Sequence, residues 1–223
     1  DIERMLTLYQ RSGRLSTEIV PTVEVLDNNR INLTYEIEES DVAEVSKIVI
    51  LGNEVYSSSK IKSLMKTKEK TFLRFLSSAD RYDPDKLEFD KQLITQHYYN
   101  NGYADFKFLT SIAQLTPNTN NFEIILTLEE GNQYLFGDIV ISNELKKINS
   151  DIIKNSLPLS SNQIYNASKI KESIEGIKNI AELQGYSFID IDPSLSKRED
   201  SKLIDVNFII NEGPRVYINS INI

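Results

Sequence analysis

Few side chains in this sequence are of types that could catalyse a reaction or hold a metal ion. His97 is the only histidine of the 223 residues and there are no cysteines, so a zinc site or a catalytic triad would lack a second imidazole or a thiolate. The acidic pairs Glu129-Glu130 and Asp190-x-Asp192 fall near expected strand ends and lack the spacing of a calcium loop. We interpret His97 as structural and both acidic pairs as solvated charge, and we expect no catalytic residue, no metal and no cofactor.

The charge of the chain disfavours a polyphosphate partner. It has 33 acidic and 25 basic residues, a formal net charge of −8, whereas affinity for nucleic acid comes largely from Lys and Arg. No apolar run approaches the roughly 18 residues that cross a bilayer. The first nine residues fit an amphipathic helix better than a signal peptide. We expect a soluble fragment that does not bind nucleic acid.

An internal repeat is the strongest pattern in the sequence. Apolar residues at helical spacing precede three glycines, and the last apolar residue comes four positions before each glycine. A residue just past a helix often needs a positive φ, which glycine reaches without steric cost, so each glycine is predicted to cap a helix. The three segments are Arg11-Ser12-Gly13, Asn101-Gly102-Tyr103 and Gln184-Gly185-Tyr186.

Strand-like runs follow each of these glycines. The second run of each pair alternates apolar and mostly polar residues, which predicts a strand with one buried face. The alternating runs are residues 31–37, 122–128 and 204–210, and the strands end at Ser40, Gly131 and Gly213.

A further short strand opens eight residues beyond each of these ends, at Ile48, Ile139 and Ile221. Between that strand and the glycine-capped helix there is room for one more helix, at about residues 57–68 and 149–157. Each unit is therefore predicted to run strand, helix, helix, strand, strand.

These elements predict an α+β fold of tandem units, each with a three-stranded mixed sheet covered by two helices. At roughly 80 to 90 residues a unit is small but able to fold alone. Residues 1–41 would be the C-terminal part of one unit, 42–131 and 132–213 two complete units, and 214–223 the first strand of another.

The chain resembles tandem POTRA repeats over its whole length. The order of the elements carries this resemblance, together with the turn Leu51-Gly52-Asn53, the segment Asn101-Gly102-Tyr103 and the strand end Glu130-Gly131. Residues 85–106 and 165–190 are most similar to the third and fourth repeats of outer-membrane β-barrel assembly factors. Parts of a second and a fifth repeat would flank them.

Two positions depart from the repeat pattern. Asn143 stands where Gly52 stands in the previous unit, and Ser40 replaces the terminal glycine. Asparagine tolerates left-handed backbone, so Asn143 is expected to make the same turn. Ser40 indicates a different junction between the first two units.

The resemblance implies a non-enzymatic scaffold in the periplasm, tethered to the outer membrane of a Gram-negative bacterium by a C-terminal membrane barrel outside this chain. It implies nascent outer-membrane proteins and accessory lipoproteins as partners. One alternative is the POTRA region of a translocation-assembly or two-partner-secretion transporter. Another is a periplasmic enzyme or metal-binding module, which would need a pocket with convergent titratable groups.

The apolar pattern of residues 104–115 does not fit a regular strand. Phe106 and Phe108 share one parity, and Leu109 and Ala113 the other, so a β-bulge is predicted near residues 109–111. The counterpart in the last unit carries Pro193, which fits an edge strand. In POTRA folds this strand lies on a sheet edge.

Such an edge has two interpretations. It is either blunted against aggregation by the bulge and the proline, or open for the addition of a client strand. The candidate strand-addition edge consists of Ala104, Asp105, Phe106, Lys107, Phe108, Leu109, Thr110, Ser111, Ile112, Ala113, Gln114 and Leu115.

A second apolar cluster falls between the two helices of the middle unit. It either packs onto its own core or the adjacent repeat, or forms an exposed docking patch. Its members are Phe72, Leu73, Phe75 and Leu76.

Overall fold

A computed structural model of the chain describes residues 1–27, 30–71, 79–116, 119, 121–186 and 188–213. It divides into two compact units, Asp1–Thr95 with Lys107–Glu130, and Gln96–Phe106 with Gly131–Ile223. The candidate docking patch Phe72, Leu73, Phe75 and Leu76 and the expected strand at 214–223 lie outside the described residues.

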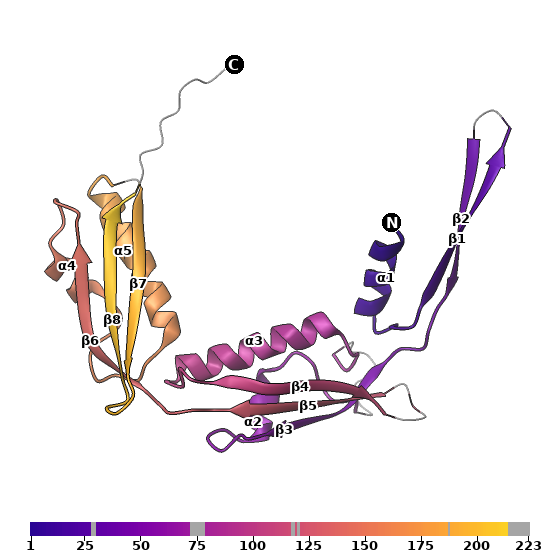
Figure 1. Cartoon of the computed structure of the whole chain (residues 1–223), viewed down its shortest axis with the longest axis horizontal. Coiled ribbons are helices and arrows are strands. Elements are labelled where there is room, and N and C mark those ends of the chain that lie inside the picture. Colours follow the sequence, from indigo (N-terminus) through magenta and orange to yellow (C-terminus); the bar gives the residue numbers. More distant parts are fainter. Residues whose placement is uncertain (28–29, 72–78, 117–118, 120, 187, 214–223) are drawn as a thin grey trace. The chain divides into compact units, whose positions relative to one another are not determined.

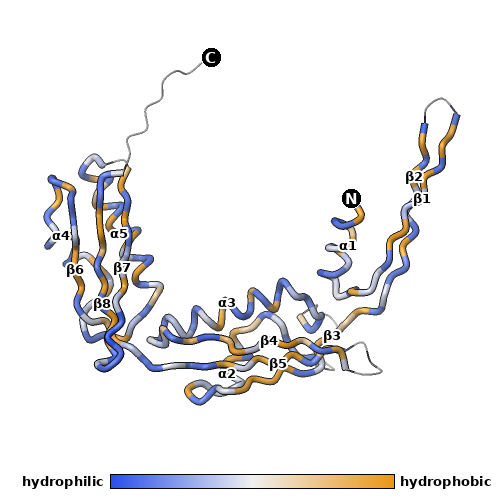
Figure 2. Tube along the Cα trace, viewed as in Figure 1, coloured by the Kyte–Doolittle hydropathy of each residue, from blue (hydrophilic) through white to orange (hydrophobic). Residues whose placement is uncertain are grey.

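The first unit begins with a helix and a long β-hairpin (Figure 1). Helix α1 spans Ile2–Arg11, and strands β1 (Glu18–Leu26) and β2 (Arg30–Glu38) pair antiparallel. Hydrophobic and hydrophilic positions alternate along both strands (Figure 2). The apolar side chains are nevertheless exposed, with Val25 at 80% and Ile31 at 65%, because this sheet has only two strands. Two strands alone bury little apolar surface.

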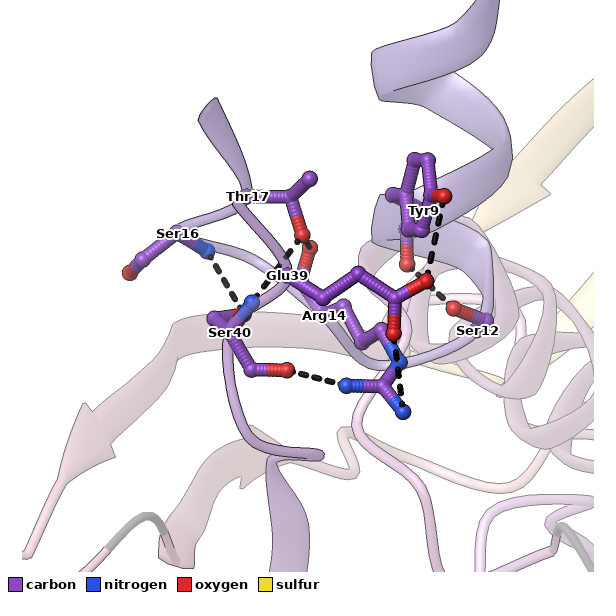
Figure 3. A network of polar contacts seen from close by, with 7 residues as sticks. All are labelled: Tyr9, Ser12, Arg14, Ser16, Thr17, Glu39 and Ser40. Carbon is purple, nitrogen blue, oxygen red and sulfur yellow. Dashed lines mark hydrogen bonds and ion pairs between the residues drawn. The ribbon is translucent and has the colours of Figure 1, made fainter. Parts of the chain in front are cut away.

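A polar network holds the base of this hairpin (Figure 3). Glu39 accepts a hydrogen bond of 3.1 Å from the Tyr9 hydroxyl and pairs with Arg14 at 3.3 Å. Arg14 also donates to the carbonyl oxygen of Ser40, and the Ser40 hydroxyl oxygen accepts the Ser16 amide at 3.3 Å. The last contact uses a side chain that glycine lacks, which accounts for serine at this repeat end.

The first unit also contains a three-stranded sheet in the order β3-β5-β4. Strand β3 (Glu44–Leu51) lies parallel to β5 (Asn121–Glu129), and β4 (Lys107–Leu115) lies antiparallel to it. Helix α2 (Ser58–Leu64) is preceded by Ser57, whose side chain caps it by accepting a hydrogen bond from the Lys60 amide at 3.2 Å. Helix α3 (Pro84–Asn100) runs along the sheet (Figure 1).

The second unit repeats this architecture with strands in the order β6-β8-β7. The strands β6 (Leu135–Asn143), β7 (Ile189–Arg198) and β8 (Leu203–Glu212) form a mixed sheet against α4 (Ser150–Ser156) and α5 (Ala167–Leu183). The predicted α+β fold with three-stranded mixed sheets and paired helices is therefore confirmed. The largest fully buried side chains of this core are Tyr134, Phe136, Ile153, Ile177, Ile204 and Phe208.

The predicted helix caps are also confirmed, since Gly13, Gly102 and Gly185 have φ of 85°, 96° and 86°. The expectation for Asn143 is wrong, because its φ is not positive. Its side chain shapes the turn instead: Nδ2 donates to the Ile148 carbonyl at 2.7 Å, and Oδ1 accepts the Leu145 amide at 2.9 Å. An asparagine side chain thus replaces a turn that glycine makes with its backbone.

Candidate strand-addition edge

Strand β4 is an edge of its sheet, because β5 is its only neighbour in the strand order. The pairing passes from Phe108 opposite Leu128 directly to Thr110 opposite Thr127, so Leu109 is an extra residue. The predicted bulge is therefore present. From Thr110 to the end of the strand the register is regular.

One hydrogen bond sets the direction of the amides along this regular part. Just beyond the paired strands, the Thr116 amide donates to the Asn121 carbonyl at 2.8 Å, so Thr116 faces β5. Because backbone groups alternate in direction along a strand, the amides of Ser111, Ala113 and Leu115 point away from β5. Within the described residues no acceptor outside the sheet meets these three amides.

The opposite edge of the sheet is covered by its own chain at Val45 and Ile48. The Val45 amide donates to the Asp80 carbonyl at 2.7 Å, and the Val45 carbonyl accepts the Lys70 amide at 2.7 Å. The Ile48 amide donates to the Glu69 carboxylate at 2.8 Å. Of the two edges of this sheet, β4 is thus the one with three outward amides still available.

Apolar side chains lie on both faces beside these amides. On the open face, Ile112 is 47% exposed and lies opposite Ile125, which in turn lies opposite Val49. On the helix-covered face, Ala113 is half-buried opposite Ile124, which is fully buried. An extended segment added here would find apolar contacts on each side of its pleat.

The first three residues of the predicted edge have another role. Ala104, Asp105 and Phe106 precede β4 and form a loop within the second unit. Phe106 is buried and stacks on Tyr98 with ring centroids 4.0 Å apart. The candidate edge is therefore narrower than predicted and runs over Lys107–Leu115. Phe106 and Phe108 lie two positions apart, which suggested one face of a single strand. In the structure Phe106 precedes β4 and packs on Tyr98 instead.

The acidic residues also depart from the prediction at one position. Glu130 is buried, and its carboxylate accepts the amides of Glu54 at 2.8 Å and Val55 at 2.9 Å, so it is not solvated charge. Glu129, Asp190 and Asp192 are exposed. Among the residues that the structure describes, no group of three or more His, Cys, Asp or Glu side chains could hold a metal ion.

The fold and the edge define an α+β repeat module in which strand β4 is an open sheet edge. No helix in the described part of the chain is long and apolar enough to cross a membrane. The model of the POTRA family, surface antigen variable number repeat, matches residues 43–131 and 134–213. The chain belongs to the POTRA family, as its resemblance in sequence indicated.

Relatives of known identity support the same assignment. The chain is 26% identical over 215 residues to the outer membrane protein assembly factor BamA of Neisseria meningitidis serogroup B, covering 96% of the chain and 27% of that protein. It is 24% identical over 222 residues to BamA of Neorickettsia risticii, covering 100% of the chain and 30% of that protein. The chain thus spans less than a third of the length of either relative.

Solved structures share the fold. The third to fifth POTRA repeats of Haemophilus influenzae BamA match with a TM-score of 0.64 and 22% identity, over 78% of this chain and 67% of that one. BamA of Haemophilus ducreyi lacking repeats one to three matches with a TM-score of 0.59 and 13% identity, over 76% of this chain and 29% of that one.

Proposed function

We propose that this chain is part of the periplasmic scaffold of an outer-membrane β-barrel assembly machine, and that β4 receives extended segments of client outer-membrane proteins as an added strand. The full-length protein would carry a C-terminal membrane barrel and bind accessory lipoproteins, and the module itself would not be an enzyme. The observation that carries the proposal is the row of outward amides at Ser111, Ala113 and Leu115.

Backbone pairing suits an acceptor of many different clients. Main-chain donors and acceptors on an edge strand pair with any sequence, so affinity does not depend on a particular side chain. About four to six new hydrogen bonds, each contributing roughly 0.5 to 1.5 kcal/mol net, would oppose an ordering cost of about 1 to 2 kcal/mol per client residue. Binding is therefore expected to be weak and transient, which allows the client to be passed on.

The side chains at the edge favour clients with apolar residues on at least one face. Ile112 on the open face and Ala113 on the helix-covered face would contact alternate residues of the added segment. A strand of a transmembrane barrel alternates apolar lipid-facing residues with mostly polar residues of the barrel interior, so its apolar face could lie against one of these two side chains. This agrees with the relatives, which are named outer membrane protein assembly factors.

The test is an NMR titration of the 223-residue chain with a peptide from a transmembrane strand of an outer-membrane protein. We expect shifts along residues 107–115. Ser111→Pro removes an outward amide and no bond to β5, so it should keep the fold and abolish these shifts. Ser111→Ala, which retains the amide, should bind like the wild type, and so should Lys107→Ala. Shifts confined to the helical face, or normal binding by Ser111→Pro, would contradict the proposal.

A further inference from the structure

The second unit contains an edge strand equivalent to β4. Strand β7 pairs with β8 alone, and its register has no shift. Leu126 and Phe208 are equivalent, since each lies five residues before the glycine that ends its repeat. Ser111 is opposite Leu126, and Pro193 is opposite Phe208. Ser111 and Pro193 therefore occupy the same place in the two sheets.

Pro193 also has the same orientation as Ser111. The Gly213 amide donates to the Phe188 carbonyl at 3.0 Å just beyond the paired strands, so Phe188 faces β8. By alternation, Ile189, Ile191, Pro193 and Leu195 direct their backbone groups away from the sheet. A proline here removes no hydrogen bond to β8. It removes a donor from the middle of the outward row, and its ring lies where an added strand would pack.

The far end of the β7 edge has a second obstacle. Lys197 belongs to the outward row, and its Nζ donates to the Ala104 carbonyl at 3.3 Å and pairs with the Asp105 carboxylate. This side chain ties the end of the strand to the loop before β4, and Pro193 separates the outward amides of Ile189 and Ile191 from those of Leu195 and Lys197. Strand β4 has no such interruption from Thr110 to Leu115.

We infer that Pro193 closes the β7 edge to extended segments, so that of the two equivalent strands β4 and β7 only β4 receives a client strand. The inference rests on the proposed strand addition for its biological meaning. The closure itself is a separate property, because it concerns an edge that the proposed function does not use. It predicts that the two three-stranded sheets together take up one client segment, at β4.

Restoring the missing amide tests the closure. We expect Pro193→Ser and Pro193→Ala, which both regain the donor, to bind the same peptide at β7, where the wild type should give no shifts. New shifts should appear along Ile189–Leu195, and calorimetry should give one more bound peptide per chain than the wild type binds. The double variant Ser111→Pro/Pro193→Ser should give shifts at β7 and none at β4. Unchanged melting temperatures would show that each variant is folded.

The outcomes separate the two ideas. Binding of the wild type at β7, or absence of binding at β7 in both folded Pro193 variants, would overturn the closure while leaving binding at β4 intact. Binding at β7 in Pro193→Ser with none at β4 in the wild type would support the closure and overturn the proposed function.

Discussion

The hydroxyl of Tyr134 donates a hydrogen bond of 2.5 Å to the carboxylate of Asp105. Tyr134 is buried at 1% exposure, and the same carboxylate pairs with Lys197. A buried hydroxyl that donates to a charged acceptor makes one of the stronger hydrogen bonds in proteins. This bond anchors the loop that precedes β4 within the second unit.

Tyr134→Phe should therefore destabilise the chain. The change removes the donor and keeps the ring, so we expect the free energy of unfolding to fall by about 1.5 to 3 kcal/mol. Urea denaturation measures this loss. Tyr186→Phe is the matched control, because the Tyr186 hydroxyl oxygen only accepts a 3.3 Å hydrogen bond from the Lys147 amide. This variant should lose clearly less unfolding free energy than Tyr134→Phe. Equal losses in the two variants would show that Asp105 is not an effective acceptor.

The same bond predicts a loss of stability at high pH. The hydrogen bond to Asp105, with burial, raises the pKa of Tyr134 from 10.0 to about 12. The folded state holds the proton more tightly than the unfolded state, so this contribution is complete below pH 10 and is lost as the pH rises through 12. The difference in unfolding free energy between wild type and Tyr134→Phe should shrink across this range. Lysines also titrate in this range, but they do so in both proteins and their effect cancels in the difference. A difference in unfolding free energy that stays constant from pH 10 to 12 would therefore refute the prediction.

Much of the fold was predictable because its signals are local. The positive φ at Gly13, Gly102 and Gly185 follows from where the apolar helical pattern stops. The alternation in residues 122–128 and 204–210 predicts strands with one buried face, and both are found. The bulge at Leu109 was likewise visible as a conflict of parity.

The parts that were not predicted depend on tertiary contacts. Phe106 has the parity of a strand residue but packs on Tyr98, and Glu130 looks like surface charge but accepts two backbone amides. Which residues of β4 turn their amides away from β5 depends on how the two strands pair. The hydrogen bond from the Thr116 amide to the Asn121 carbonyl shows this, and the sequence does not. The edge position of Pro193 could be predicted, whereas its equivalence to Ser111 required the registers of both sheets.

The turn after β3 gives a last prediction, in which two glycines with nearly equal φ angles respond differently to alanine. Gly52 has φ +80° and Gly185 has φ +86°, so alanine at either position costs about 1 to 2 kcal/mol in backbone strain. A Cβ at Gly52 would also lie 2.3 Å from the Leu128 carbonyl oxygen, whereas one at Gly185 would meet nothing within 4 Å. The clash involves backbone, which cannot move aside as a flexible side chain can, and should add about 1 to 3 kcal/mol.

Chemical denaturation of Gly52→Ala and Gly185→Ala measures that difference directly. Gly176→Ala is the control for the effect of alanine itself, because Gly176 lies inside α5 with no atom within 4 Å of its Cβ position. This variant should raise the free energy of unfolding by about 0.5 to 1 kcal/mol. Equal destabilisation by Gly52→Ala and Gly185→Ala would mean that the turn relaxes away from Leu128. In that case the close approach of β5 to this turn would not be what requires glycine at position 52.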